Sequence, residues 1–318
     1  AQSFAQMGTP GKEAVPQIIE CLKDKEFLVR ANAIWALNKM GSDSAPAVKA
    51  LAPFLKNPEP DLRPDAANAL EAIGPAAKAA VPELIEMFTK GIDVVVLRNN
   101  AASALCAIGL DEKQGEAVVG PAYGAMKTSK NRDESELMAK LLATAGPVAL
   151  SKLEEGLKNP DRKFGGYCAY AICLMEHRLK GSAKRSIPYL MEAFKADPKG
   201  AAGQNSALAL AQMGSAAKDA LPAFVEMIKH AEGDSWAISC AANALVMIDP
   251  ASVSILAEGL QDKEPKVRAD LVDAIAIFKE SARPVIKDIV LLLKDTDPAG
   301  GFQQFAVQHR QHLALLHA

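Results

Sequence analysis

The sequence of 318 residues predicts an all-α fold, a right-handed α–α superhelix of about eight to nine antiparallel helical hairpins. The main observation is an internal repeat: residues 207–229, ALALAQMGSAAKDALPAFVEMIK, match residues 1–23 at ten of twenty-three positions. Residues 68–89 carry a third copy of the same pattern. The second observation is composition, because aromatic residues make up only 5% and alanine supplies much of the apolar content, which favours closely packed helices.

The first helix of each hairpin is predicted from apolar residues at helical spacing, as in Val15, Ile18 and Leu22. A proline stands in the opening turn of several of these helices, where the missing N–H costs nothing. These prolines are Pro16, Pro82, Pro188 and Pro222. A short polar turn, such as residues 23–26, then leads into the second helix.

The second helices align on one apolar position, which we call the anchor. The anchors recur every 30 to 37 residues, at Leu37, Leu70, Leu105, Leu142, Cys173, Leu210, Leu245 and Ile275. The residues four before and three after each anchor share its helical face, so these positions are predicted to form the buried stripe. Most second helices end on a glycine suited to a left-handed cap: Gly8, Gly41, Gly74, Gly109, Gly146 and Gly214.

Charge and cysteine content limit the classes of function. A net charge of −2 disfavours binding to nucleic acid through phosphates. The longest apolar run, residues 289–293, is too short to cross a membrane, so membrane insertion is not expected. The five cysteines form no CxxC pair and are predicted to be small buried residues of a reduced protein. We expect a cytoplasmic protein, with a removed leader as the open alternative.

A recurring pattern of Asp, then Val-Arg, then an anchor resembles the HEAT-repeat family, specifically the short HEAT-like repeats of phycobilisome bilin lyases. In that family the Asp and the Arg six residues later hydrogen-bond between successive turns as a ladder, and the second helices line the concave surface. The residues that match are Asp24 with Arg30, Asn57 with Arg63, and Asp262 with Arg268. The resemblance covers nearly the whole chain and implies the fold, but it says almost nothing about function.

We expect residues 1–318 to form a single solenoid that starts in the middle of a repeat. The repeat pattern weakens over residues 116–199, which we predict to be irregular central repeats, because Gly165-Gly166 replaces the Val-Arg pair there. The four tyrosines lie in the same segment. Residues 284–318 are predicted to form a C-terminal capping repeat that ends in an amphipathic helix.

Departures from the repeat are the candidate binding residues. Trp35 stands two positions before its anchor, in a column that is otherwise mostly polar and lies off the buried stripe. In the irregular segment, an apolar line on the same face suggests a groove for a partner helix or an extended peptide. The predicted partner-binding residues are Trp35, Phe164, Tyr167, Tyr170, Leu174 and Leu208. The alternative is that Trp35 packs against residues upstream of Ala1 and that the larger central side chains fill the core.

The sequence favours a non-enzymatic scaffold or accessory subunit that binds another protein on the concave face, within a multi-subunit assembly. No catalytic set, cofactor site or metal site is expected, and His309 and His312 are predicted to lie on a solvated helix face. The alternative function, which rests on the resemblance alone, is a bilin-lyase-like chaperone-enzyme that holds a tetrapyrrole and its acceptor protein.

Overall fold

The computed structural model describes residues 12–91 and 94–292. These residues form α-helices joined by short 3₁₀ helices and turns, as an all-α fold requires. The chain divides into two compact units, Ala1–Lys152 and Leu153–Ala318, which we call unit 1 and unit 2.

In unit 1, helices alternate between the first and second positions of each hairpin. In chain order they are α3 (Val15–Cys21), α4 (Phe27–Met40), α5 (Val48–Leu51), α6 (Leu62–Ile73), α7 (Val81–Lys90), α8 (Val95–Ile108), α9 (Glu112–Thr128) and α10 (Arg132–Ala145). The 3₁₀ helices that precede or follow the first helices are η1 (Gly41–Ala47), η2 (Ala52–Lys56), η3 (Gly74–Ala80) and η4 (Gly146–Ala149).

The division between the units falls within α11 (Leu150–Leu157). In unit 2 the later α-helices are α12 (Arg162–Arg178), α13 (Ile187–Ala196), α14 (Ala201–Gln212), α15 (Leu221–Lys229), α16 (Ser235–Ile248), α17 (Val253–Glu258), α18 (Pro265–Ile277) and α19 (Ile286–Leu292). The 3₁₀ helices are η5 (Lys184–Ser186), η6 (Gly214–Ala220), η7 (Pro250–Ser252), η8 (Gly259–Gln261) and η9 (Lys279–Val285).

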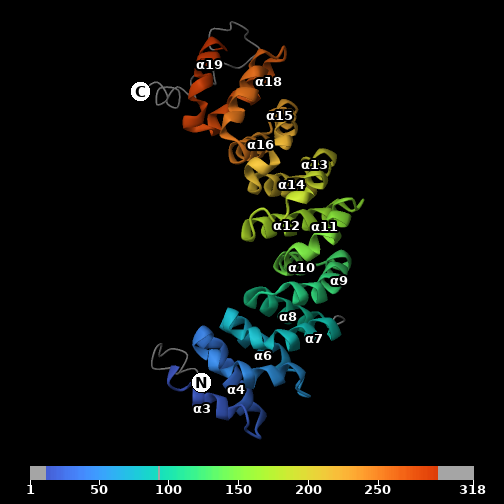
Figure 1. Ribbon diagram of the computed structural model, residues 1–318, viewed down its shortest axis with the longest axis vertical. Coiled ribbons are helices and arrows are strands. Elements are labelled where there is room, and N and C mark those ends of the chain that lie inside the picture. The colour runs from blue at the N-terminus through green and yellow to red at the C-terminus, as the bar shows by residue number, and fades with distance from the viewer. Residues whose placement is uncertain (1–11, 92–93, 293–318) are drawn as a thin grey trace. The chain divides into compact units, whose positions relative to one another are not determined.

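Each unit consists of two layers of helices (Figure 1). In unit 1 the second helices α4, α6, α8 and α10 form one layer, and each contacts the next. In unit 2 the second helices α12, α14, α16 and α18 contact one another in the same order, while α13 and α15 lie in the other layer. The second helices therefore form a continuous layer within each unit, and this layer carries the candidate site.

The core follows the predicted stripe. Each of the eight anchors is buried, with at most 5% of its surface exposed. Four positions earlier, Ala66, Ala101, Ala169 and Ala241 are fully buried, which lets adjacent second helices approach closely. The all-α solenoid predicted from the repeat is confirmed, and so is the position of its core.

Helix boundaries also follow the predicted signals. Pro16, Pro82, Pro188 and Pro222 all lie in the first turn of their helices. The described glycines at the ends of second helices have φ between +54° and +86°, a region that residues with a side chain rarely adopt. Gly8 lies outside the described residues.

One glycine, Gly166, lets α12 and α14 approach closely in the segment where the repeat pattern weakens. A Cβ on Gly166 would lie 2.9 Å from the Cβ of Ala201 and 3.1 Å from its carbonyl carbon, so this contact requires glycine. The amide of Asn205 donates a 2.9 Å hydrogen bond to the carbonyl of Gly166. Close helix packing thus replaces the Asp and Arg turn contacts at this point.

The Asp and Arg of the repeat pattern are joined through the backbone of their own turn. In three hairpins the guanidinium donates to the carbonyl six residues earlier: Arg30 to Asp24 at 2.7 Å, Arg63 to Asn57 at 2.6 Å, and Arg268 to Asp262 at 2.9 Å. The carboxylate or amide oxygen of the earlier residue instead accepts from the N–H two residues on, as in the 2.8 Å bond from Glu26 to Asp24.

A second set of hydrogen bonds connects successive turns. The guanidinium of Arg30 reaches the next turn and donates to both carboxylate oxygens of Glu59, at 2.6 and 2.5 Å. Arg98 makes the equivalent contact with Glu134, whose other carboxylate oxygen accepts from Ser129 at 2.5 Å. Arg30 bonds to both carboxylate oxygens of Glu59, and Glu134 accepts from both Arg98 and Ser129. These charge-assisted bonds help to hold neighbouring hairpins at their spacing.

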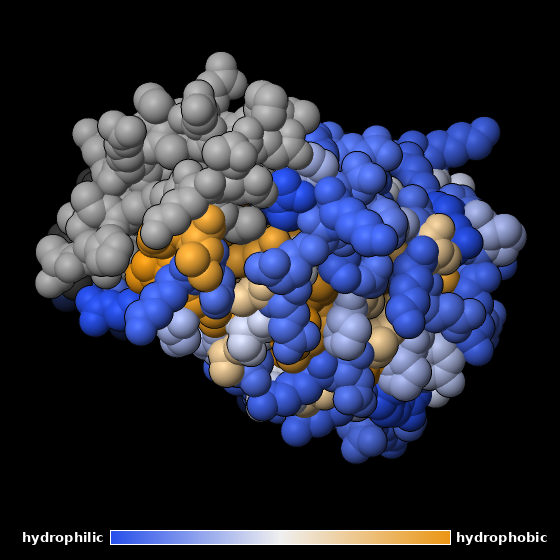
Figure 2. All heavy atoms as spheres, turned by 90° about the horizontal axis from the view of Figure 1, so that it is seen from above, coloured by the Kyte–Doolittle hydropathy of each residue, from blue (hydrophilic) through white to orange (hydrophobic). Residues whose placement is uncertain are grey.

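Hydrophilic side chains make up most of the surface in the end-on view, and hydrophobic ones show between them (Figure 2). Among the described helices, none has an apolar stretch that would be long enough to pass through a membrane.

Candidate partner-binding groove

A groove runs between the second helices α14 and α16 of unit 2. Its volume is about 330 Å³. Small residues form much of its lining and three large apolar side chains stand with them. The full lining is Ala207, Leu208, Ala211, Trp236, Ser239, Cys240, Asn243, Ala244 and Met247.

The large side chains of the groove are unusually exposed. Leu208 exposes 44% of its surface, Trp236 46% and Met247 48%. Large apolar side chains on the surface are ordinary when they are scattered singly, but three that line one hollow make it a candidate interaction site. The groove therefore exposes a cluster of large apolar side chains on the surface of unit 2.

Both helices of the groove lack charged residues. The segment between Lys199 and Lys218 contains α14 and has none, and neither does the segment between Asp234 and Asp249, which contains α16. Burial raises the pKa of the Cys240 thiol, so this residue is also neutral at pH 7. A solvated helix normally carries charges on its outer face.

The polar side chains around the groove bond to nearby backbone. The amide of Asn243 donates to the carbonyl of Ser239, one turn earlier in the same helix, at 2.7 Å. On α14, the amide of Gln204 donates to the carbonyl of Lys199 at 2.7 Å. Each of these amides thus donates one hydrogen bond within the protein.

Leu208 lines this groove, as one of the six residues predicted to bind a partner. Trp35 lies on α4 of unit 1, is half-buried, and has the ammonium of Lys39 5.7 Å from its ring centroid. Tyr167, Tyr170 and Leu174 lie on α12 and are half-buried.

Phe164 also lies on α12 but exposes only 3% of its surface, so it belongs to the core and offers a partner almost nothing to contact. The sequence reasoning missed Trp236 and Met247. Met247 stands two positions after the anchor Leu245, and Trp236 stands nine before it. Neither is at one of the aligned positions of the second helices from which binding residues were predicted. The signal that could have found them is the absence of charge from two successive second helices.

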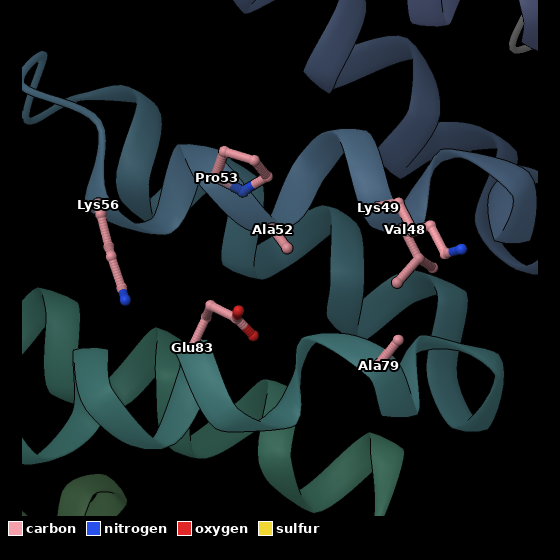
Figure 3. A pocket seen from close by; sticks show the side chains of 7 residues that line it. All are labelled: Val48, Lys49, Ala52, Pro53, Lys56, Ala79 and Glu83. Atoms are coloured by element: carbon pink, nitrogen blue, oxygen red, sulfur yellow. The ribbon is translucent and has the colours of Figure 1, made fainter.

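A second hollow, of about 430 Å³, lies among first helices of unit 1 (Figure 3). Lys56 and Glu83 extend into it from opposite sides. Lys56 also pairs with Glu86, and hydrogen bonds from Lys56 and Lys90 lower the pKa of Glu86 to about 2. This hollow is lined by charged side chains, which distinguishes it from the neutral groove of unit 2.

The cysteines only partly match their predicted burial. Cys168 and Cys173 are buried, and burial raises the pKa of both thiols, that of Cys173 to about 11. The prediction is wrong for Cys21, which is exposed at the end of α3. Within the residues that the structure describes, no three His, Cys, Asp or Glu side chains are grouped to hold a metal ion. His309 and His312 lie outside those residues.

The fold and the layer of second helices define an α-helical solenoid, and comparison with known proteins bears out its predicted resemblance to HEAT repeats. Residues 1–52 match the family model described as HEAT repeats. Among the residues that the structure describes, the match covers the hairpin of α3 and α4 and the start of the next. A search of curated proteins finds no match.

Among solved structures, the chain is similar to the karyopherin Kap121p bound to the extreme C-terminus of the protein phosphatase Cdc14p. That similarity has a TM-score of 0.55 and 14% identity, and covers 95% of this chain and 39% of the other. Kap121p bound to Pho4p is similar with a TM-score of 0.56, 15% identity and the same coverage. The chain thus spans about two fifths of the length of these relatives, and at such identity the likeness shows the fold alone.

Proposed function

We propose that this chain is a non-enzymatic protein-binding scaffold, or the accessory subunit of a larger assembly, which binds its partner on the layer of second helices. The observation that carries the proposal is the neutral groove between α14 and α16, with Leu208, Trp236 and Met247 exposed along it. The Kap121p structures support it by analogy, since they contain a solenoid of the same type bound to another protein.

The groove offers useful binding energy. Complete burial of a large apolar side chain is worth ~1.5–3 kcal/mol. Leu208, Trp236 and Met247 each have 44–48% of their surface left to cover. Covering all three would therefore contribute about 2–4 kcal/mol. A groove of this kind can serve as the hot spot of a larger interface.

The test compares partners recovered from a lysate of the source cells by the wild-type chain and by two variants. L208S/M247S removes two of the exposed apolar side chains of the groove. L179S is the matched control, because Leu179 is also an exposed aliphatic residue of unit 2, at 41%, but lies at the end of α12 outside the groove.

We expect the specific partner to be lost with L208S/M247S and retained with L179S. Both variants should melt close to the wild type, since surface substitutions usually change stability by about 0.5 kcal/mol or less. Equal recovery of every bound protein by all three chains would show that the groove is not the binding site.

A further inference from the structure

The shape of the groove limits what can occupy it. On α16 its lining residues recur at one-turn intervals through Trp236, Cys240, Asn243 and Met247. Eleven residues of α-helix separate the first from the last, which corresponds to about 16 Å or three turns. Between the large side chains, Ala207, Ala211 and Ala244 make a floor of small residues. A hollow of about 330 Å³ with this floor accommodates several large side chains that project from one face of a helix laid across it.

The hydrogen-bonding groups of the groove favour a helix over an extended peptide. An extended peptide presents backbone N–H and C=O groups that need partners when they are buried. The lining offers few such partners, on the side chains of Trp236, Ser239 and Asn243, and one N–H of the Asn243 amide already donates to the carbonyl of Ser239 at 2.7 Å. The backbones of α14 and α16 are internally bonded along their length, whereas an incoming helix satisfies its own backbone.

Charge limits the occupant further. A charged side chain buried against α14 and α16 would lose its hydration and find no opposite charge on either helix. The face that docks must therefore be as neutral as the groove. Large aliphatic side chains on that face would fill the space above the alanine floor.

We infer that the groove between α14 and α16 binds an α-helix of another protein, whose docking face is uncharged and carries large aliphatic side chains at intervals of three and four residues. This inference rests on the proposed function and specifies the partner of the same site. The predicted occupant is a helix and not an extended segment, and it belongs to another protein and not to a second copy of this chain.

The test selects binders from two displayed libraries against the full chain. In one library a helical scaffold presents randomised positions on one face, and in the other the peptides are linear and rich in proline, which prevents helix formation. We expect binders from the helical library with apolar and uncharged residues at the randomised positions. Their affinity should fall at least about tenfold in L208S/M247S and change less than about twofold in L179S.

Alkylation of the chain's own cysteines gives a second readout. Cys240 lines the groove, whereas Cys21 is exposed on α3 of unit 1 and serves as the internal control. Mass spectrometry should show that a selected helix slows the alkylation of Cys240 at least about fivefold and leaves Cys21 unchanged. Protection of neither cysteine by any selected helix would overturn the inference.

The remaining outcomes separate the two proposals. If only linear peptides bind and they are sensitive to L208S/M247S, the helical occupant is wrong but protein binding at the groove stands. If no binder from either library is sensitive to L208S/M247S, the proposed function at this groove fails as well. A dimer of the isolated chain that L208S/M247S dissociates, measured by light scattering, would show that the occupant is a second copy.

Discussion

Replacing Arg98 by methionine should destabilise unit 1 by breaking a buried ion pair. The side chains of Arg98 and Glu134 expose only 12% and 8% of their surface, and they join α8 to the start of α10. Removing one partner of such a pair usually costs ~3–5 kcal/mol, because the other charge is left buried. We expect the lower end, about 3 kcal/mol, since Ser129 still donates to Glu134 and the N-terminus of α10 favours a negative charge.

The loss of stability should depend on pH in a defined direction. Burial alone would raise the pKa of Glu134, but the hydrogen bonds from Ser129 and Arg98 and the charge of Arg98 together lower it below its ordinary value of 4.5. In the wild type, this carboxylate therefore stabilises the fold above about pH 4.5, and the stabilisation is lost as the pH falls through the lowered pKa. In R98M burial prevails and the pKa rises, so lowering the pH relieves the penalty. The difference between the two proteins should be largest at pH 7 and small near pH 3.5.

Urea unfolding followed by Trp35 fluorescence measures this effect within unit 1, in chains that also carry W236F. The matched control is R132M, because Arg132 forms an exposed ion pair with Glu136, with 80% of the arginine side chain in contact with solvent. Exposed pairs contribute about 0–1 kcal/mol, so R132M should unfold almost as the parent does. Equal losses in R98M and R132M, or a loss in R98M that does not change with pH, would refute the argument.

Two further substitutions test the core and the helix ends of unit 1, with the same measurement. L105A removes a fully buried anchor of α8 and should cost ~2–5 kcal/mol by leaving a cavity, whereas a change below 1 kcal/mol would place Leu105 outside the core. G74A should cost ~1–3 kcal/mol from backbone strain alone, because Gly74 has φ +70° and ψ −141° while a Cβ would meet no atom within 4 Å. An unchanged midpoint for G74A would mean that this turn relaxes without penalty.

The fold could be predicted from the sequence because the core repeats. An anchor such as Leu70 or Leu245 is buried by the helices before and after it, so each hairpin imposes the same requirement on the same positions. Proline and glycine marked the helix ends for an equally local reason, as Pro82 and Gly74 show. Local chemistry and repeated packing point to one structure, and the prediction needed little else.

The turns show where a sequence pattern is insufficient. The spacing of Asp24 and Arg30 indicates a contact across six residues, but it does not say which atoms make the contact. In the structure the arginine binds the carbonyl, and the aspartate side chain caps the turn through the N–H of Glu26. Several acceptors lie within reach of a guanidinium, and only the path of the backbone decides among them.

The candidate site was predicted less well because exposure depends on neighbours in space. Trp35 and Trp236 both stand out in the sequence, yet Trp35 is half-buried whereas Trp236 exposes 46% of its surface. Phe164 looked like part of a surface line but is covered in the core. A column of aligned residues gives the direction of a side chain around its helix, and it does not show how closely the next helix packs over it.

The buried stripe and the outer face of a second helix are under separate physical constraints. On α16, Ala241 and Leu245 face the core, and the corresponding residues of the other second helices in the described part of the chain are buried as well. Trp236 and Met247 lie on the same helix but face solvent, where neither the fold nor the neighbouring helix requires an apolar side chain. A helix that served only as a solvated surface would carry charges on its outer face, as α10 does with Arg132 and Glu136. The lack of any charge on both α14 and α16 thus goes beyond what packing requires, and it is what the proposed binding of an uncharged helix face would require.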